Sequence, residues 1–489
     1  MIGLAGVVLS LVLLMYLAYR GVNVLVLAPL LALLATLAAG DLPLLATYTG
    51  VFMGSLGRYI IQFFPLFLLG AIFGKLMDDS GSARAIAAAI VERTGEARAI
   101  LAVVLACGVL TYGGVSLFVV AFAVFPIAVE LFRRSGTPKR LIPGAIALGS
   151  FTFTMTALPG TPAIQNAIPA PFFGTDAFAA PGLGLVAGAV MFFGGMAWLG
   201  YRARSARAAG EGFEAAARGA ATGTVLAADG PRASTVGAMQ VADVPRDPPG
   251  TADGPTPPAA VAFAPILVVI AVNWLFLNVV VPTMDTSYLA EPRYGSTTEG
   301  AVRGIWAIIV ALVVAILVLV ALNLRRFADL KASVNAGTMG SLLPIFNTAS
   351  EVGYGATIAS LPAFAFIRDA VLNVGGGNPL VSLAVAVNVL AGITGSASGG
   401  MSIALQTLGS TYLDLARAAG IDPEALHRVA ALACGGFDSL PHNGAVITLL
   451  AICGLTHRES YADIGVVSVV IPLAALVLVL VLQSFLGTF

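Results

Sequence analysis

The stretch TALPGTPAIQNAIP, residues 156 to 169, places three prolines, a glycine, a glutamine and an asparagine inside a strongly apolar part of the chain. Proline has no amide hydrogen, and its ring clashes with the preceding helical turn. A helix that enters this stretch must therefore stop within it. We expect a broken helix over residues 140–170.

The composition indicates that this broken helix belongs to a membrane protein. Of the 489 residues, 58% are hydrophobic and 10% are charged, with a mean hydropathy of +0.95. Apolar stretches of about 20 residues recur, the length that crosses a bilayer. The fold class is therefore an all-α polytopic membrane protein. We expect spans at residues 2–19, 21–39, 51–76, 180–200, 260–282, 303–324, 335–358 and 463–486.

Charge and cysteine content exclude other classes of protein. The 25 basic and 25 acidic residues cancel, so nothing favours nucleic acid as a partner. Cys107, Cys434 and Cys453 are isolated in apolar surroundings, so we expect packing residues and neither a disulfide nor a metal site. We also expect no cofactor. The first 20 residues lack a basic leader, which favours a retained first helix over a cleaved signal peptide.

Three further apolar segments are interrupted. TYGGVS (111–116) and TGSASGG (394–400) divide residues 97–132 and 379–416, and their glycines release the backbone. Each segment is expected to form a re-entrant helical hairpin. DSLPHNGAVI divides residues 426–456 as ALPGTPAIQN divides 140–170, so a second discontinuous helix is expected.

These interruptions occur in matched order in the two halves. Gly114 precedes Leu158-Pro159 by about 45 residues, and Gly400 precedes Leu440-Pro441 by about 41, as expected of an internal repeat. The expected domains are a first repeat at 1–202 (scaffold spans 1–95, hairpin and broken helix 97–170, span 180–200), a linker at 203–258 and a second repeat at 259–489.

The distribution of basic residues predicts an inverted repeat. The linker is rich in alanine, glycine, proline and charge, so we expect it to be flexible and cytoplasmic. If both hairpins re-enter and residues 82–95 and 361–373 are interfacial, 19 of the 25 basic residues lie inside. Arg428 is among the few placed outside. The two halves then have opposite topology.

Non-helical backbone in a membrane is tolerated only when it is buried in protein or lines a wet cavity. We therefore expect the two hairpin tips and two breaks to line one substrate site, since half-helix ends favour ions. Packing by small residues is the alternative for any single hydroxyl. The candidate substrate-binding residues are Ser116, Thr156, Thr161, Gln165, Asn166, Ser396, Ser398, Ser439, His442 and Asn443, with Thr448 beside them.

Few ionisable residues lie in the expected membrane region. His442, Asp438 and Glu351 are the candidates for proton coupling, because buried ionisable groups usually face a cavity and His titrates near neutral pH. Alternatively, His442 is a neutral histidine bonded to backbone, Asp438 a helix cap and Glu351 a scaffold hydrogen-bond group. His427 and His457 are expected to be exposed. No catalytic residues are predicted.

FRRSGTPKRLIPGAIALGSFTFTMTALPGTPAIQNAIP (132–169) resembles the signature region of the gluconate:proton symporter family, within the ion transporter superfamily. The resemblance implies a homodimeric carrier of sugar acids or related small carboxylates in a bacterial inner membrane, with an elevator-like transport domain. GGFDSLPHNGAVITLL (435–450) is more similar to the branch associated with short hydroxy acids such as 3-hydroxybutyrate.

The function expected is proton symport of a small organic carboxylate, by alternating access between the repeats. Sodium coupling stays open, because glycine-rich tips with hydroxyls and free carbonyls also suit a cation. A cation/proton antiporter or channel is a further alternative, although the first break carries no acidic residue. A membrane enzyme is disfavoured, since LMDDSG (76–81) resembles a polar helix end.

Overall fold

The computed structural model describes residues 2–20, 22–40, 42–95, 98–213, 256–374, 376–441 and 443–489. Residues 214–255 of the expected linker and His442 lie outside the described residues. Every secondary-structure element in the described part of the chain is helical. The fold class predicted from composition is confirmed.

The first half begins with two apolar helices and ends with a long one. Its elements are α1 (Ile2–Tyr19), α2 (Val24–Ala39), α3 (Leu44–Ala46), a π-helical turn (Thr47–Phe52), α4 (Met53–Asp79), α5 (Ser82–Thr94), α6 (Ala99–Tyr112), α7 (Leu117–Arg134), α8 (Ile142–Ser150), α9 (Ile164–Ala167), α10 (Ala170–Phe173) and α11 (Pro181–Ala208).

The second half likewise contains both long and short helices. Its elements are α13 (Ala259–Leu275), α14 (Glu299–Asn323), α15 (Leu330–Ser360), α16 (Phe364–Leu372), α17 (Pro379–Thr394), α18 (Ala397–Ala418), α19 (Pro423–Cys434), α20 (Gly444–Cys453), α21 (His457–Gly465) and α22 (Ile471–Leu486). Short 3-10 or π-helical turns follow α13 and α14, precede α20 and join α21 to α22.

Five helical stretches of the described residues are long and apolar enough to cross a membrane, as a multi-pass protein requires. They are Leu44–Asp79, Pro181–Ala208, Ala259–Thr283, Glu299–Arg326 and His457–Leu486. The predicted spans 2–19 and 21–39 form shorter apolar helices, and 335–358 lies in α15, which bends by 98° into α16.

Residues 82–95 and 361–373, the two segments expected to lie at the membrane interface, contain α5 and α16, which have 13 and 9 residues. At 1.5 Å per residue, neither reaches the roughly 30 Å needed to cross the hydrocarbon core.

The two hairpins turn at left-handed glycines. Gly114 (φ +91°) follows α6, and Gly395 (φ +64°) follows α17. Glycine adopts this conformation without the strain that a Cβ would add. Gly400, which the sequence pairing matched with Gly114, is instead inside α18, where its missing Cβ lets the backbone of Ala391 approach. The turn glycines Gly114 and Gly395 precede Leu158 and Leu440 by 44 and 45 residues.

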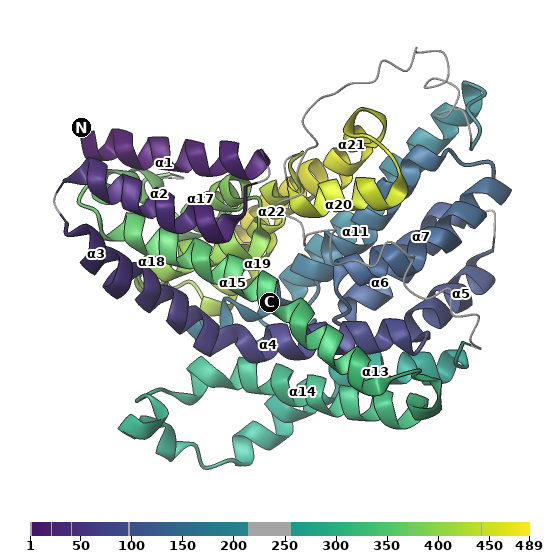
Figure 1. The fold of residues 1–489 in the computed structure, drawn as a ribbon, viewed down its shortest axis with the longest axis horizontal. Helices are drawn as coiled ribbons and strands as arrows, with labels where there is room; N and C mark the ends of the chain where they lie inside the picture. Colours follow the sequence, from purple (N-terminus) through teal and green to yellow (C-terminus); the bar gives the residue numbers. More distant parts are fainter. Residues whose placement is uncertain are drawn as a thin grey trace.

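Helices α4 and α15 form the centre of the molecule and pack along most of their length. In Figure 1 they run between one end, formed by α1, α2, α17 and α18, and another, formed by α5, α6 and α7. A Cβ on Gly337 would lie 2.7 Å from the Cα of Ile72, and one on Gly353 would lie 2.9 Å from the carbonyl of Phe52. From the first of these contacts to the second, residue numbers rise along α15 and fall towards the start of α4, so the two helices are antiparallel.

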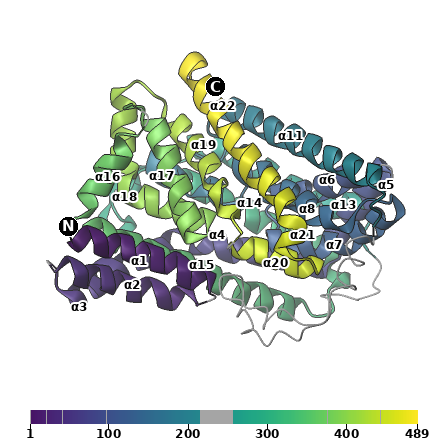
Figure 2. The same cartoon turned by 90° about the horizontal axis from the view of Figure 1, so that it is seen from above.

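The last long helices of the two halves also pack antiparallel. The amide of Gly182, at the start of α11, donates to the carbonyl of Phe489, 2.9 Å away, while Trp198 further along α11 reaches Asp463 of α21. Figure 2 shows α11 and α22 side by side. In both of these closely packed pairs the two helices therefore run in opposite directions.

Candidate functional site

The first break follows a π-helical turn at Phe153–Ala157. Leu158 adopts an extended conformation, Gly160 has φ +81°, and the helix resumes only at Ile164. Pro159 and Pro162 have no amide hydrogen to continue the ladder. The predicted interruption is therefore present, and it leaves several carbonyls without a partner in the same helix.

Side chains of α6, α13 and α9 pair these carbonyls. Tyr112 Oη donates to Pro159 O (2.7 Å), Asn273 Nδ2 to Gly160 O (3.4 Å) and Asn166 Nδ2 to Thr161 O (3.1 Å). Burial in protein thus explains how the broken backbone is tolerated, and these carbonyls do not require a wet cavity.

Arg428 of α19 completes the first break. Its side chain is fully buried, and its guanidinium donates to Ala157 O (3.1 Å), Ala179 O (2.6 and 3.0 Å) and Asn166 Oδ1 (3.2 Å). Among the described residues, no carboxylate forms an ion pair with it. Carbonyl and amide oxygens therefore take the place of water around this cation.

His427 is also buried, which contradicts the expectation that it is exposed. Its Nδ1 lies 2.7 Å from Thr175 Oγ1 and its Nε2 lies 3.3 Å from Asn166 Oδ1. Glu424, one turn earlier, accepts from the amide of Ala180 at 2.8 Å. Positions 424, 427 and 428 share one helix face, so the spacing in PEALHR was the signal for this contact surface.

The second break spans Gly435 to Asn443. Ser439 Oγ donates to Asp438 Oδ1 (3.0 Å), and Asp438 is buried. Asn443 Oδ1 caps α20 by accepting from Ala445 N, while its Nδ2 donates to Gly395 O at 2.6 Å. His457 Nε2 lies 2.8 Å from Pro441 O, and the His457 side chain is exposed as predicted. The break is thus bound to the hairpin turn of its own half, as Tyr112 binds the first break.

Ser396 caps α18 at the second hairpin turn. Its Oγ accepts from Gly399 N (3.0 Å) and lies 3.5 Å from Ser398 Oγ. The carboxylate of Glu351, on α15, lies against Gly399 and Ser396, where a Cβ on Gly399 would overlap Glu351 Oε2. Glu351 is 4% exposed, and Oε2 has no hydrogen-bond partner. This buried carboxyl group therefore faces the hairpin.

The remaining candidates occupy varied positions. Thr156 Oγ1 donates to Thr152 O of its own helix, and its methyl group touches Gly435 at the start of the second break. Thr161 Oγ1 donates to Tyr112 O at 3.4 Å. Gln165 is half-buried, and Ser116 is exposed with its amide against Gly74. The Thr448 hydroxyl is buried without a partner.

The described contacts place the candidate residues in two clusters, one around each hairpin turn and its break, which meet where Thr156 contacts Gly435. The first turn touches α4 at Gly74, near Ile72, and the second touches α15 at Glu351, near Gly353. Ile72 packs on Gly337 of α15, which lies 16 residues before Gly353. The two hairpin turns therefore contact the α4–α15 pair about 24 Å apart along the helix axis. Thr156 and Gly435 form the contact between the two breaks.

A cavity of about 180 Å³ lies away from both breaks, among α1, α15, α16, α17 and α18. Its lining is almost entirely apolar, including Leu11, Ile358, Phe364 and Val389. A small polar solute would gain few hydrogen bonds there, so the breaks remain the better candidate site.

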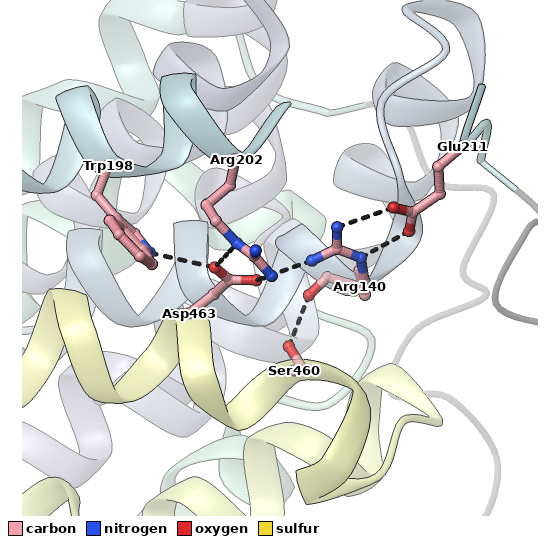
Figure 3. Close-up of polar contacts among 6 residues, drawn as sticks. All are labelled: Arg140, Trp198, Arg202, Glu211, Ser460 and Asp463. Carbon is pink, nitrogen blue, oxygen red and sulfur yellow. Dashed lines mark hydrogen bonds and ion pairs between the residues drawn. The ribbon is translucent and has the colours of Figure 1, made fainter. Parts of the chain in front are cut away.

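An ion-pair network joins the two halves near the start of the linker (Figure 3). Arg140 binds Glu211 through two hydrogen bonds (2.6 and 2.9 Å) and Asp463 at 3.2 Å. Arg202 binds Asp463 at 2.7 Å, Trp198 Nε1 donates to it at 3.1 Å, and Ser460 donates to Arg140 O. Asp463 is 1% exposed, so paired donors offset its burial.

This network predicts an acid-sensitive contact. Hydrogen bonds from Arg140 hold the pKa of Glu211 below its ordinary value of 4.5. A carboxyl group with a lowered pKa stabilises the fold above its unfolded-state pKa, and that stability is lost as the pH falls through the folded-state pKa. Glu211→Gln should therefore lose less thermal stability than the wild type between about pH 7 and about pH 3.5. The exposed Glu92→Gln variant should respond like the wild type, and an equal loss in Glu211→Gln would contradict the prediction.

Comparison with known proteins identifies the class of this chain. A Bacillus subtilis (strain 168) protein named uncharacterized transporter YxjC is 44% identical over 487 residues, which cover 98% of each chain. The chain belongs to the same transporter family. No family model matches the chain, and the resemblance to gluconate:proton symporters stays a prediction. Membership in the transporter family agrees with the expectation that this protein is not an enzyme.

Proposed function

We propose that this family member is a secondary active transporter that imports a small organic carboxylate together with a coupling cation. The interior position of the two breaks supports this proposal most directly. Each break is bound to the hairpin turn of its own half, and the first is also bound to α19 of the second half. Irregular backbone between two halves is where transporters of this kind place their substrate.

The halves are proposed to form an inverted repeat, with first and second repeats at 1–202 and 259–489. Antiparallel packing of α4 with α15 and of α11 with α21 and α22 supports this arrangement, because equivalent helices of an inverted repeat cross the membrane in opposite directions. The proposed location is a bacterial cytoplasmic membrane, with the linker on the cytoplasmic side. The homodimer and the elevator-like movement remain expectations from the family resemblance.

The proposed substrate is a sugar acid such as gluconate or a short hydroxy acid such as 3-hydroxybutyrate. Hydroxyl and amide groups line both clusters, and a cap residue opens α18 and α20. Helix amino termini favour carboxylates, and hydroxyl or amide groups suit hydroxy substituents. A proton is the proposed coupling ion if Asp438, Glu351 or His442 carries it. Sodium coupling remains the second candidate.

Uptake by proteoliposomes tests the proposal. Radiolabelled gluconate, 3-hydroxybutyrate, lactate and citrate are each supplied with a proton gradient, a sodium gradient or neither. We expect saturable uptake of one class of carboxylate that is driven by one gradient. Gradient-driven cation flux without uptake of any carboxylate would favour the antiporter or channel alternative.

Asn443→Ser is expected to lower carboxylate uptake about tenfold, because it loses the hydrogen bond to Gly395 O that joins the second break to its hairpin. Serine can still cap α20, so folding should be preserved. Asn278→Ser is the matched control, since Asn278 is exposed and bonds only to its own helix. Equal uptake by Asn443→Ser and the wild type would show that transport does not depend on this hydrogen bond.

A further inference from the structure

Three buried polar side chains from three different helices meet beside the second hairpin. Tyr59 of α4 is 0% exposed, Glu351 of α15 is 4% exposed and Ser402 of α18 is 1% exposed. Tyr59 faces Ser402 and lies within electrostatic range of Glu351. Glu351 contacts Gly399, and Ser402 follows Gly399 by three residues on the same helix face.

One oxygen of each of these three side chains has no direct hydrogen bond. Tyr59 Oη, Ser402 Oγ and Glu351 Oε2 are all buried, and none has a partner with the geometry of a direct hydrogen bond. A buried polar atom without a partner costs about 1 to 3 kcal/mol, and native proteins satisfy nearly all of them. Tyr59 Oη lies beside Ser402 Oγ, and Glu351 Oε2 lies against Gly399 one helical turn away, so the three atoms mark a candidate site for a bound ion.

The chemistry of the cluster selects the kind of ion. Carboxylate and hydroxyl oxygens are hard ligands, which suit alkali and alkaline-earth cations. The cluster has one carboxylate and two neutral hydroxyls, so its single negative charge matches a monovalent ion. A proton on Glu351 would satisfy one oxygen, whereas a metal ion bound among the three side chains would use all three as ligands.

We infer that Tyr59, Glu351 and Ser402 form a binding site for a monovalent metal cation, with sodium as the ion to be tested. The ligands come from α4 and α15, the central pair, and from α18 of the hairpin. Ion binding therefore holds the hairpin against the central pair. The role as coupling ion rests on the proposed function, but the binding itself does not.

Thermal unfolding of the purified full-length protein tests the site without any substrate. The unfolding midpoint is measured in increasing sodium chloride, with choline chloride keeping ionic strength constant, at fixed pH. A ligand that binds the folded state raises the midpoint with concentration. We expect a saturable rise in the wild type, its loss in Glu351→Gln, and an apparent Kd about tenfold higher in Tyr59→Phe and Ser402→Ala.

Two matched controls separate the site from general packing. Tyr354→Phe removes a buried hydroxyl that is paired with Ser10, and Ser341→Ala removes one that bonds to its own helix. Both should keep the sodium response of the wild type. A wild-type midpoint independent of sodium would overturn the inference, whether or not it depends on pH. An intact sodium response in a protein that transports no carboxylate would instead reject only the proposed function.

Discussion

Replacing Arg428 by methionine is expected to destabilise the protein by about 3 kcal/mol or more, one of the largest effects of any single substitution in this chain. The guanidinium is the donor for three buried acceptors, Ala157 O, Ala179 O and Asn166 Oδ1. Each acceptor left unpaired costs about 1 to 3 kcal/mol. Methionine fills most of the volume, so the loss comes from hydrogen bonding rather than from a cavity.

Loss of the buried cation also has an opposing effect. Removing a buried cation recovers part of its desolvation cost, and apolar replacements of buried ion pairs are sometimes stabilising. That outcome requires the partners to be replaced as well. Here two acceptors are backbone carbonyls, Ala157 O of the first break and Ala179 O just before α11, which no side-chain substitution removes. The unpaired acceptors should therefore dominate.

Thermal or denaturant unfolding in detergent measures this effect. Arg417→Met is the control, because Arg417 is exposed at the end of α18 and its replacement should change stability by less than about 0.5 kcal/mol. Arg428→Lys should restore little, since a single ammonium cannot reproduce the planar fork of donors. Wild-type stability in Arg428→Met would show that the break does not depend on α19.

Gly400→Ala is the second substitution with a large expected effect. A Cβ at this position would overlap the backbone of Ala391 and Leu390, where α18 crosses α17. Backbone atoms cannot rotate away as a side chain can, so the two helices of the hairpin must separate. Overpacking of this kind costs about 1 to 3 kcal/mol and sometimes more.

Gly57→Ala provides a control with the opposite sign. Gly57 lies within α4, and a Cβ there would have no atom within 4 Å. Alanine should stabilise this helix by about 0.5 to 1 kcal/mol through the lower entropy of the unfolded chain. Unfolding midpoints of the two variants should therefore move in opposite directions. A stable Gly400→Ala protein would show that the hairpin packing is looser than described.

The sequence located the irregular elements but only part of their surroundings. Asn166 and Asn443 were predicted within the breaks, and each makes the contacts of a structural polar residue there. Tyr112, Asn273 and Arg428, which pair the freed carbonyls, were not predicted as partners. Nor were Tyr59 and Ser402, because a single tyrosine or serine in an apolar helix resembles an ordinary packing residue.

By itself, the sequence determined the membrane class, the two hairpins and the two breaks. These depend on local properties: hydropathy over about 20 residues, the missing amide of proline and the backbone freedom of glycine. Only the tertiary structure decided what satisfies the broken backbone. A buried carbonyl accepts from whichever donor packing brings within reach, and for Ala157 that donor is Arg428, 271 residues away along the chain. For the same reason Arg428, a cation next to a histidine that the sequence predicts to be exposed, is one of the most deeply buried side chains of the protein.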